Sequence, residues 1–262
     1  MSGHSKWAKI KRAKGANDAK RGALFTKLAK NITIAASEAG GDPDMNFALR
    51  LAIEKAKAAN MPADNITRAI KKGTGEGEKV QIQRISYEAL GPGGVSLIID
   101  CQTDNTNRTV SEVRKLIENH GGKMVPGGSI AWQFVERGLI TILPAVSKKA
   151  EKFGAEDTYE DVSIDEVQMS LLDIEGILDI NIVEHEIDGN QLEALEVTTD
   201  KVDFSNVLKA IEDLSYRLVS AELIKEPKES VNVSAEDMSK LTSLIESVDD
   251  HDDVDSVWTN SN

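Results

Sequence analysis

The first thirty residues carry the side chains best suited to chemistry with phosphate groups. They hold nine lysines and arginines against one acidic residue. Phosphate oxygens attract flexible cations, and each neutralised phosphate releases counterions, which favours binding to a nucleic acid. An interleaved tryptophan can stack on an unpaired base or pack on a protein core. We therefore expect nucleic-acid contacts from Lys6, Trp7, Lys9, Lys11, Arg12, Lys14, Lys20, Arg21, Lys27 and Lys30.

The charge of the whole chain needs to be divided before it can be interpreted. The formal net charge is −13, yet residues 1–75 hold 15 basic against 6 acidic residues and residues 76–262 hold 16 against 38. A polyanion is attracted by the first part and repelled by the rest, so its binding should be oriented. The alternatives are a solvated, solubilising face and a calmodulin-type or membrane-surface helix, which share this signature.

Two glycine-rich stretches give a weaker signal for nucleotide binding. GTGEGE at residues 73–78 lacks the Lys-Ser/Thr pair of a phosphate-binding loop, and GPGG at residues 91–94 joins two predicted strands. We expect a linker at the first stretch and a hairpin turn at the second.

Metal and catalytic patterns are weak. The acidic run at residues 249–255 departs from a calcium-binding loop and lacks its glycine, so we expect a solvated surface. The polar run at residues 104–108 can in principle hold a hydrolytic site, but an asparagine cap from Asn105 or Asn107 is the simpler explanation. No metal-ligand spacing joins the four histidines, which are His4, His120, His185 and His251. We expect no catalytic residue, metal, cofactor or small-molecule substrate, and hence no enzyme.

The basic side chains must be positioned by helices. Apolar residues recur at helical spacing over residues 24–39 and 45–59, and a short third helix ends at Gly73. Asp42–Pro43 supplies the expected cap of the second helix. The alanine-rich faces predict a small bundle.

The periodicity changes after residue 80. We expect strands at residues 85–90, 95–101 and 129–136, with a helix at 107–120. A β-α-β-β-α-β order, the ferredoxin-like order, follows from residue 138 to residue 227. A strand at 231–235, a helix at 236–248 and a strand around 254–258 come last, and they can complete the sheet begun at residue 80.

The expected fold is therefore α+β with three domains. Residues 1–77 form a basic helical domain, and residues 78–136 with 228–262 form a central α/β domain. Residues 137–227 form an inserted ferredoxin-like domain. The single Cys101 lies in the apolar run VSLIIDC, where we expect a buried thiol, and it fits a reducing cytoplasm. No apolar run approaches the ~18 residues of a membrane span, and we expect a cytoplasmic protein without membrane contact.

Six ordered motifs resemble those of the YebC family, which comprises probable transcriptional regulators related to a mitochondrial translational activator. They are GHSKW (3–7), DAKRGALFTKLAKNI (18–32), NMPADNITRAIKKGTG (60–75), YEALGPGGV (87–95), TDNTNRTVSEVR (103–114) and GGSIAWQF (127–134). The resemblance implies the same three domains and no enzymatic activity. It also implies nucleic-acid contact through the basic residues of positions 3–32.

The partner expected from this resemblance is promoter DNA or ribosomal RNA, and in the latter case the ribosome itself. Some members of the family look like promoter binders, whereas others look like ribosome-associated factors that aid synthesis of difficult sequences such as proline runs. The lack of a recognition-helix motif favours shape or ribosomal RNA. A protein–protein adaptor that uses the acidic ferredoxin-like domain, and a hydrolase with a site at residues 104–108, are the other classes of function left open.

Overall fold

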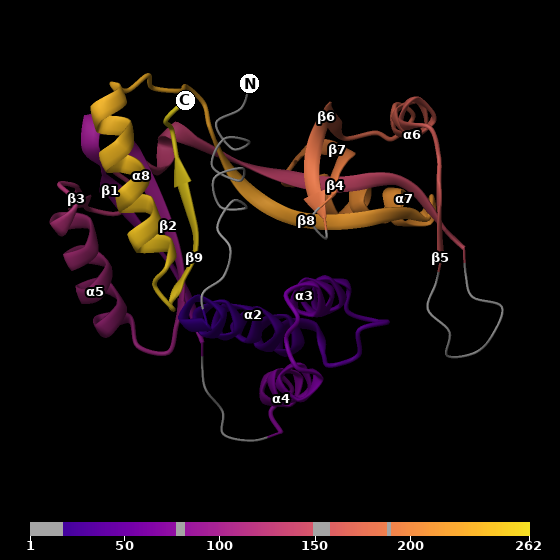
Figure 1. Ribbon diagram of the computed structural model, residues 1–262, viewed down its shortest axis with the longest axis horizontal. Helices are drawn as coiled ribbons and strands as arrows, with labels where there is room; N and C mark the ends of the chain where they lie inside the picture. Colours follow the sequence, from indigo (N-terminus) through magenta and orange to yellow (C-terminus); the bar gives the residue numbers. More distant parts are fainter. Residues whose placement is uncertain (1–17, 77–81, 149–157, 188–189) are drawn as a thin grey trace. The chain divides into compact units, whose positions relative to one another are not determined.

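The computed structural model describes residues 18–76, 82–148, 158–187 and 190–262 (Figure 1). The chain divides into two compact units, Met1–Phe134 with Pro227–Asn262 and Val135–Glu226. The first unit holds the N-terminal helices and a sheet, and the second holds another sheet with two helices. This confirms the mixed α+β fold. The expected domain boundaries near residues 77, 137 and 228 stay a prediction.

Three helices form the N-terminal bundle: α2 (Asp18–Ala39), α3 (Phe47–Ala58) and α4 (Ala63–Gly73). Their core is aliphatic, with Ile32, Leu49 and Ala56 fully buried. The cap predicted at Asp42–Pro43 is wrong.

The true cap of α3 is Asn46, whose side chain accepts a hydrogen bond from the Leu49 N–H at 3.0 Å. The Asn46 amide also donates to the carbonyls of Ala35 and Gly40, so it ties the end of α2 to the start of α3. Residues before it form a turn, and Met45 is 82% exposed rather than part of the apolar face.

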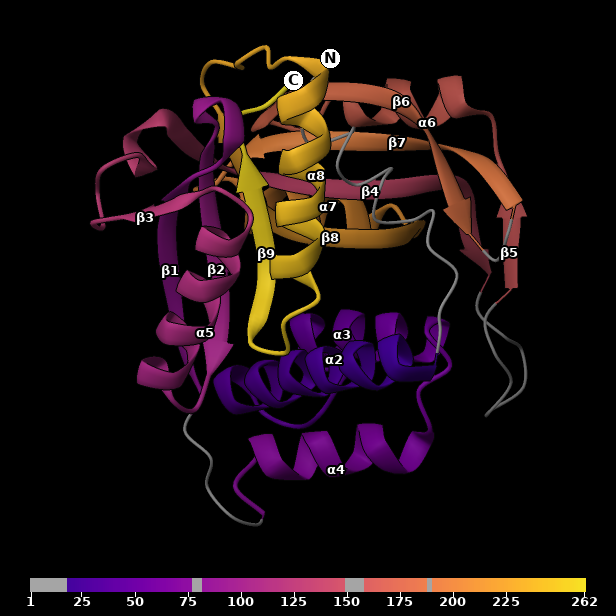
Figure 2. The ribbon, with the colours of Figure 1, turned by 60° about the vertical axis from the view of Figure 1, so that its left-hand side comes forward.

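The sheet of the first unit has the order β3-β1-β2-β9, and every neighbour is antiparallel. Its strands are β1 (Gln83–Leu90), β2 (Ser96–Thr103), β3 (Lys123–Val125) and β9 (Val254–Thr259). Helices α5 (Thr106–Asn119) and α8 (Ala235–Asp249) cover one face, as Figure 2 shows. The pairing of β2 with β9 confirms that the C-terminal segment completes this sheet.

Two of the expected strands are wrong. Residues 129–136 contain the short helix η2 (Ala131–Gln133), and the strand begins only at Phe134. Val231 forms one isolated bridge with Ser261, and residues 232–235 belong to no strand. The GPGG stretch does join β1 to β2 as expected, through the single turn η1 (Pro92–Gly94).

The second unit has the ferredoxin-like order. Its strands β4 (Phe134–Lys148), β6 (Ile177–Ile187), β7 (Asn190–Asp200) and β8 (Tyr216–Pro227) form a sheet in which β8 pairs β4, β4 pairs β7 and β7 pairs β6. The short β5 (Thr158–Asp161) pairs the end of β4. Helices α6 (Ile164–Leu171) and α7 (Phe204–Asp213) contribute the buried residues Val167, Leu171, Val207 and Ile211. In the described part of the chain, no helix has the length and apolarity needed to cross a membrane.

Candidate nucleic-acid interface

The predicted basic segment is only partly within the described residues. Lys6, Trp7, Lys9, Lys11, Arg12 and Lys14 lie outside them. Lys20 and Arg21 belong to the first turns of α2, and Lys27 and Lys30 follow on the same helix. The expectation that these ten residues contact nucleic acid stays a prediction.

Lys27 is bonded to the last residue of α8, and Lys30 to the loop between α8 and β9. The Lys27 ammonium donates to the carbonyl of Asp249. The Lys30 ammonium donates to the carbonyl of Asp252 at 2.9 Å and forms an ion pair with the carboxylate of Asp253. These two lysines therefore join α2 to the end of α8 and to the loop before β9 in the same unit.

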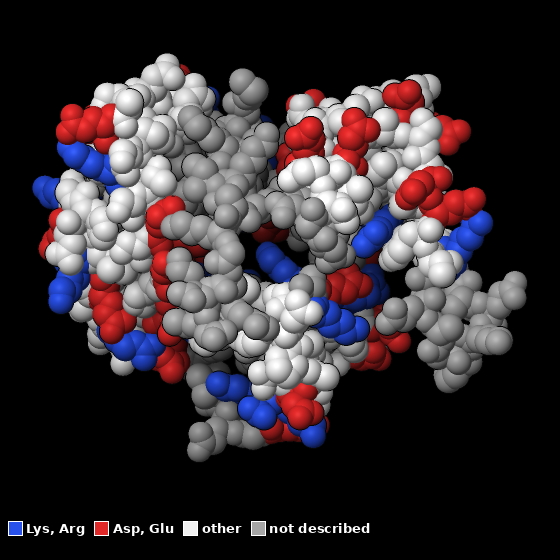
Figure 3. Space-filling model, in the orientation of Figure 1, with Lys and Arg blue, Asp and Glu red and all other residues white. Residues whose placement is uncertain are grey.

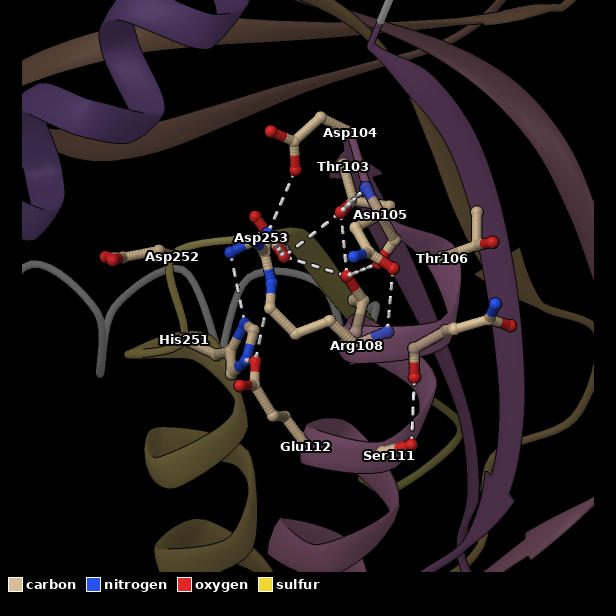
Figure 4. A network of polar contacts seen from close by, with 12 residues as sticks. Thr103, Asp104, Asn105, Thr106, Arg108, Ser111, Glu112, His251, Asp252 and Asp253 are labelled. Atoms are coloured by element: carbon tan, nitrogen blue, oxygen red, sulfur yellow. Dashed lines mark hydrogen bonds and ion pairs between the residues drawn. The ribbon is translucent and has the colours of Figure 1, made fainter.

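Asp253 is the centre of this contact, and it is only 3% exposed. Figure 4 shows the groups that converge on it. Its carboxylate accepts hydrogen bonds from Arg108 Nη2 at 2.8 Å, Thr109 Oγ1 at 2.8 Å and Thr103 Oγ1 at 3.1 Å. A carboxylate surrounded by two cations and two hydroxyls is well compensated for its loss of water.

The pKa of Asp253 follows from these partners. Burial by itself raises the pKa, but hydrogen bonds from Lys30, Arg108 and Thr109 outweigh burial and hold it well below the ordinary value for an aspartate. The expectation that the whole acidic run at residues 249–255 is a solvated surface is therefore wrong for Asp253. It holds for Asp252, whose side chain is exposed.

His251 and Glu112 extend the network beside Asp253. Glu112, His251 and Asp253 bring ligand atoms within 4.8 Å of one another, a donor set that a divalent metal can use. Here, however, His251 Nδ1 accepts from the Asp253 backbone N–H at 3.1 Å, and His251 Nε2 lies 2.9 Å from Glu112 Oε2. Both ring nitrogens and the Asp253 carboxylate are already engaged, so the geometry is that of a hydrogen-bonded bridge.

The polar run at residues 104–108 serves the start of α5. Asn105 is the cap, because its side chain accepts from the Arg108 N–H at 3.1 Å. Arg108 pairs with Asp104 at 3.1 Å as well as with Asp253. These contacts give Asp104, Asn105 and Arg108 a structural role at the start of α5. They confirm the cap expected at Asn105.

A second group of cations was not singled out from the sequence. Exposed lysines and arginines lie on α3 and α4, and Figure 3 shows basic side chains, with some acidic ones among them, in the lower part of the view, where Figure 1 places α4. The helical spacing of the sequence could have identified these cations, because the apolar Ile66 and Ala69 mark the buried side of α4 and the cations lie on the other side. The exposed cations are Lys55, Lys57, Arg68, Lys71 and Lys72.

Comparison with known proteins gives consistent matches along the chain. Residues 5–76 match the family model of the TACO1/YebC protein N-terminal domain, and residues 82–261 match that of the TACO1/YebC second and third domain. A protein from Natranaerobius thermophilus, named a probable transcriptional regulatory protein, is 43% identical, with 99% of this chain and 96% of the relative covered. A protein of the same name from Thermoanaerobacter pseudethanolicus is 41% identical, with coverage of 99% and 96%.

A solved structure agrees with these matches. The crystal structure of a conserved hypothetical protein from Aquifex aeolicus superposes on this chain with a TM-score of 0.76 at 33% sequence identity. The match covers 98% of this chain and 96% of the Aquifex chain. Family models that span nearly the whole sequence and full-length relatives above 40% identity lead to one conclusion. The chain belongs to the TACO1/YebC family.

Proposed function

We propose that this protein is a non-enzymatic, cytoplasmic regulator of gene expression that binds nucleic acid through its N-terminal helical region. The observation that carries the proposal is the segregation of charge. Residues 1–75 have a net charge of +9, whereas residues 135–226 hold 8 basic against 22 acidic residues. Phosphate is attracted by residues 1–75 and repelled by residues 135–226. The name given to the bacterial relatives, probable transcriptional regulatory protein, supports a regulatory role.

The contact surface has two parts. The basic segment supplies Lys6, Lys9, Lys11, Arg12, Lys14, Lys20 and Arg21 with Trp7, and the exposed face of α4 supplies Arg68, Lys71 and Lys72. Lys27 and Lys30 act in our proposal as anchors of α2, because Lys27 is bonded to the last residue of α8 and Lys30 to the loop before β9.

The composition of the α4 face suits RNA on the ribosome as well as promoter DNA, so the ribosome is a second candidate target. Thr67, Arg68, Lys71 and Lys72 are exposed there, and most of these side chains are cations. Cations that contact phosphates position a protein on a nucleic acid but carry no sequence information. A surface of this kind suits recognition by shape, as in folded RNA, as well as it suits DNA.

Binding measured across a salt series tests the proposal. The full chain is titrated with labelled duplex promoter DNA and with purified ribosomes. About five phosphate contacts give a slope of about −4 to −5 for log affinity against log salt on duplex DNA. Changing Lys9, Lys11, Arg12 and Lys14 together to Ala should weaken binding and make that slope shallower.

The matched control removes four cations from elsewhere. These four exposed cations lie outside the N-terminal helical region: Arg114, Lys115, Lys209 and Lys240. Changing them to Ala should leave the salt slope nearly unchanged. Preference for one duplex that survives high salt supports a transcriptional target, whereas tight ribosome binding with weak, sequence-blind DNA binding supports a translational one. If wild type and the basic-segment variant bind neither, the proposal is wrong, and a protein adaptor becomes the better hypothesis.

A further inference from the structure

Trp132 is an exposed aromatic side chain on a loop that is held by several hydrogen bonds. It is 67% exposed, the largest value among the aromatic residues that the structure describes. Aromatic residues make up only 4% of the chain, and leaving one in water forgoes the free energy of its burial. Its side chain lies in the motif GGSIAWQF, which the proposed basic surface does not use.

The backbone of the loop that carries Trp132 is hydrogen-bonded to a buried carboxylate. Glu88 of β1 is 7% exposed and accepts hydrogen bonds from the backbone N–H groups of Gly128 at 2.5 Å, Ile130 at 2.7 Å and Ala131 at 3.2 Å. Burial opposes ionisation, but these backbone donors outweigh it and lower the pKa of Glu88. The loop is therefore organised around a charged acceptor that stays ionised at neutral pH.

The indole itself is also held in place. Trp132 Nε1 donates to the Ser129 carbonyl at 2.9 Å. Ile130, two residues earlier, is 4% exposed and anchors the loop in the core. On the other side, the Gln133 side chain accepts from Ser96 Oγ at 3.0 Å and Asn260 Nδ2 at 3.2 Å. An aromatic ring that is fixed and exposed at once loses little conformational entropy when a ligand stacks on it.

The surroundings of the ring indicate the chemistry of that ligand. The Lys228 ammonium donates to the backbone carbonyl of Trp132 at 2.7 Å, so a cation is bonded to the same residue that carries the exposed indole. Apart from Pro126, the other exposed loop residues are small: Gly127, Gly128, Ser129 and Ala131. An interface between proteins surrounds its aromatic anchor with side chains that exclude water, and these residues are too small to do so. An exposed indole with a cation bonded to its own backbone instead matches the base and phosphate of a single strand.

We propose that Trp132 is a stacking platform for an unpaired base of a nucleic acid strand, with Lys228 contacting a neighbouring phosphate. The inference rests on the proposed nucleic-acid binding and adds to it a second, base-dependent contact site in the loop between β3 and β4. The ligand is a single-stranded or looped segment, because a base in a duplex has no free face to offer.

The test compares two oligomers with the full chain. One is a 12-nucleotide single-stranded RNA, and the other is an abasic strand of the same length and charge. Trp132→Leu keeps an apolar side chain but removes the aromatic face, so it should weaken binding of the RNA by about 5- to 100-fold and leave the abasic strand unaffected. Trp132→Phe should keep most of the affinity, and the fraction of tryptophan fluorescence quenched by RNA in wild type should fall in both variants.

A lysine pair provides the charge control. Lys228→Ala should weaken both oligomers and reduce the salt slope by about 1, whereas Lys240→Ala, an exposed lysine on α8, should change neither. If Trp132→Leu binds RNA as wild type does while the basic-segment variant loses binding, the stacking inference is overturned and the proposed function stands. If wild type binds neither oligomer, duplex DNA nor ribosomes, both are overturned.

Discussion

The ammonium of Lys30 and the carboxylate of Asp253 form an ion pair across 223 residues of sequence. One partner belongs to the basic helix α2 and the other to the loop before the last strand. The side chain of Asp253 is 4% exposed and that of Lys30 is 20% exposed, so the pair is largely shielded from water. The orientation of the basic helix on the central sheet of its unit therefore depends on a residue near the other end of the chain.

Removal of the Asp253 carboxylate should destabilise the first unit. Asp253→Ala leaves Lys30 and Arg108 without their shared partner, and breaking a buried pair in this way typically costs about 3–5 kcal/mol. Arg108 is partly exposed and can turn to water, so we expect the lower end of that range. Urea denaturation of the full chain measures the loss. Asp252→Ala is the matched control, because Asp252 contacts Lys30 through its backbone carbonyl only, and a similar loss there would contradict this account.

The contribution of Asp253 should depend on pH in a definite direction. Its pKa is depressed in the folded chain, so its stabilisation is complete above the unfolded pKa of about 3.9 and is lost as the pH falls below that value. The difference in unfolding free energy between wild type and Asp253→Asn should be constant from about pH 7 to pH 5 and shrink below about pH 4. Denaturation at a series of pH values tests this, and a difference that grows in acid would refute it.

Gly73 should not tolerate a side chain, although it sits at the end of a helix with ordinary backbone angles. A Cβ there would lie 2.4 Å from the Thr33 carbonyl oxygen and 2.7 Å from the Ala36 Cβ, both on α2. Gly73→Ala should therefore lower stability by about 1–3 kcal/mol. Gly22→Ala is the control in α2: its Cβ meets no described atom within 4 Å, and alanine should stabilise the helix by about 0.5–1 kcal/mol. Thermal midpoints that move the same way in both variants would argue against this packing.

Cys101 should be inert in the folded protein. Burial in β2, with smaller effects of nearby Asp100 and Asp253, raises the pKa of its thiol to about 12. The thiolate is the reactive form, so a disulfide reagent at pH 8 should modify native protein only as fast as it unfolds. Adding denaturant should restore the rate of an ordinary exposed thiol, and Cys101→Ser supplies the background. Rapid modification without denaturant would show that the strand opens locally.

Much of the fold can be predicted from local patterns. Helical spacing gives α2, α3, α4, α5 and α8, and alternation with turn residues gives the hairpins β1–β2 and β6–β7. The errors have physical causes. Asp42–Pro43 satisfies the local pattern of a cap, but the side chain that reaches a free N–H is Asn46. The stretch at residues 129–136 alternates like a strand, whereas its backbone donors turn to the distant carboxylate of Glu88.

The site is harder to predict because its contacts are distant in sequence. Asp253 lies in an acidic run typical of a solvated surface, and its cations, Lys30 and Arg108, come from positions 223 and 145 residues away. Lys27 and Lys30 look like their basic neighbours in the sequence, and only the structure assigns them to an internal contact. Trp132 is recognisable as part of a motif, but its exposure depends on the hydrogen bonds that fix the loop.

The place of β9 in the sheet affects how the chain can fold as the ribosome makes it. β2 is complete at Thr103, and its partner β9 begins at Val254, roughly 150 residues later. At about 5–20 residues per second, the ribosome needs roughly 8 to 30 seconds to supply that partner. During this time the contiguous Val135–Glu226 unit can fold, whereas one edge of the apolar β2 strand stays open to wrong pairing. A nascent chain halted before residue 253 would lack both the closing strand and the Asp253 partner of Lys30.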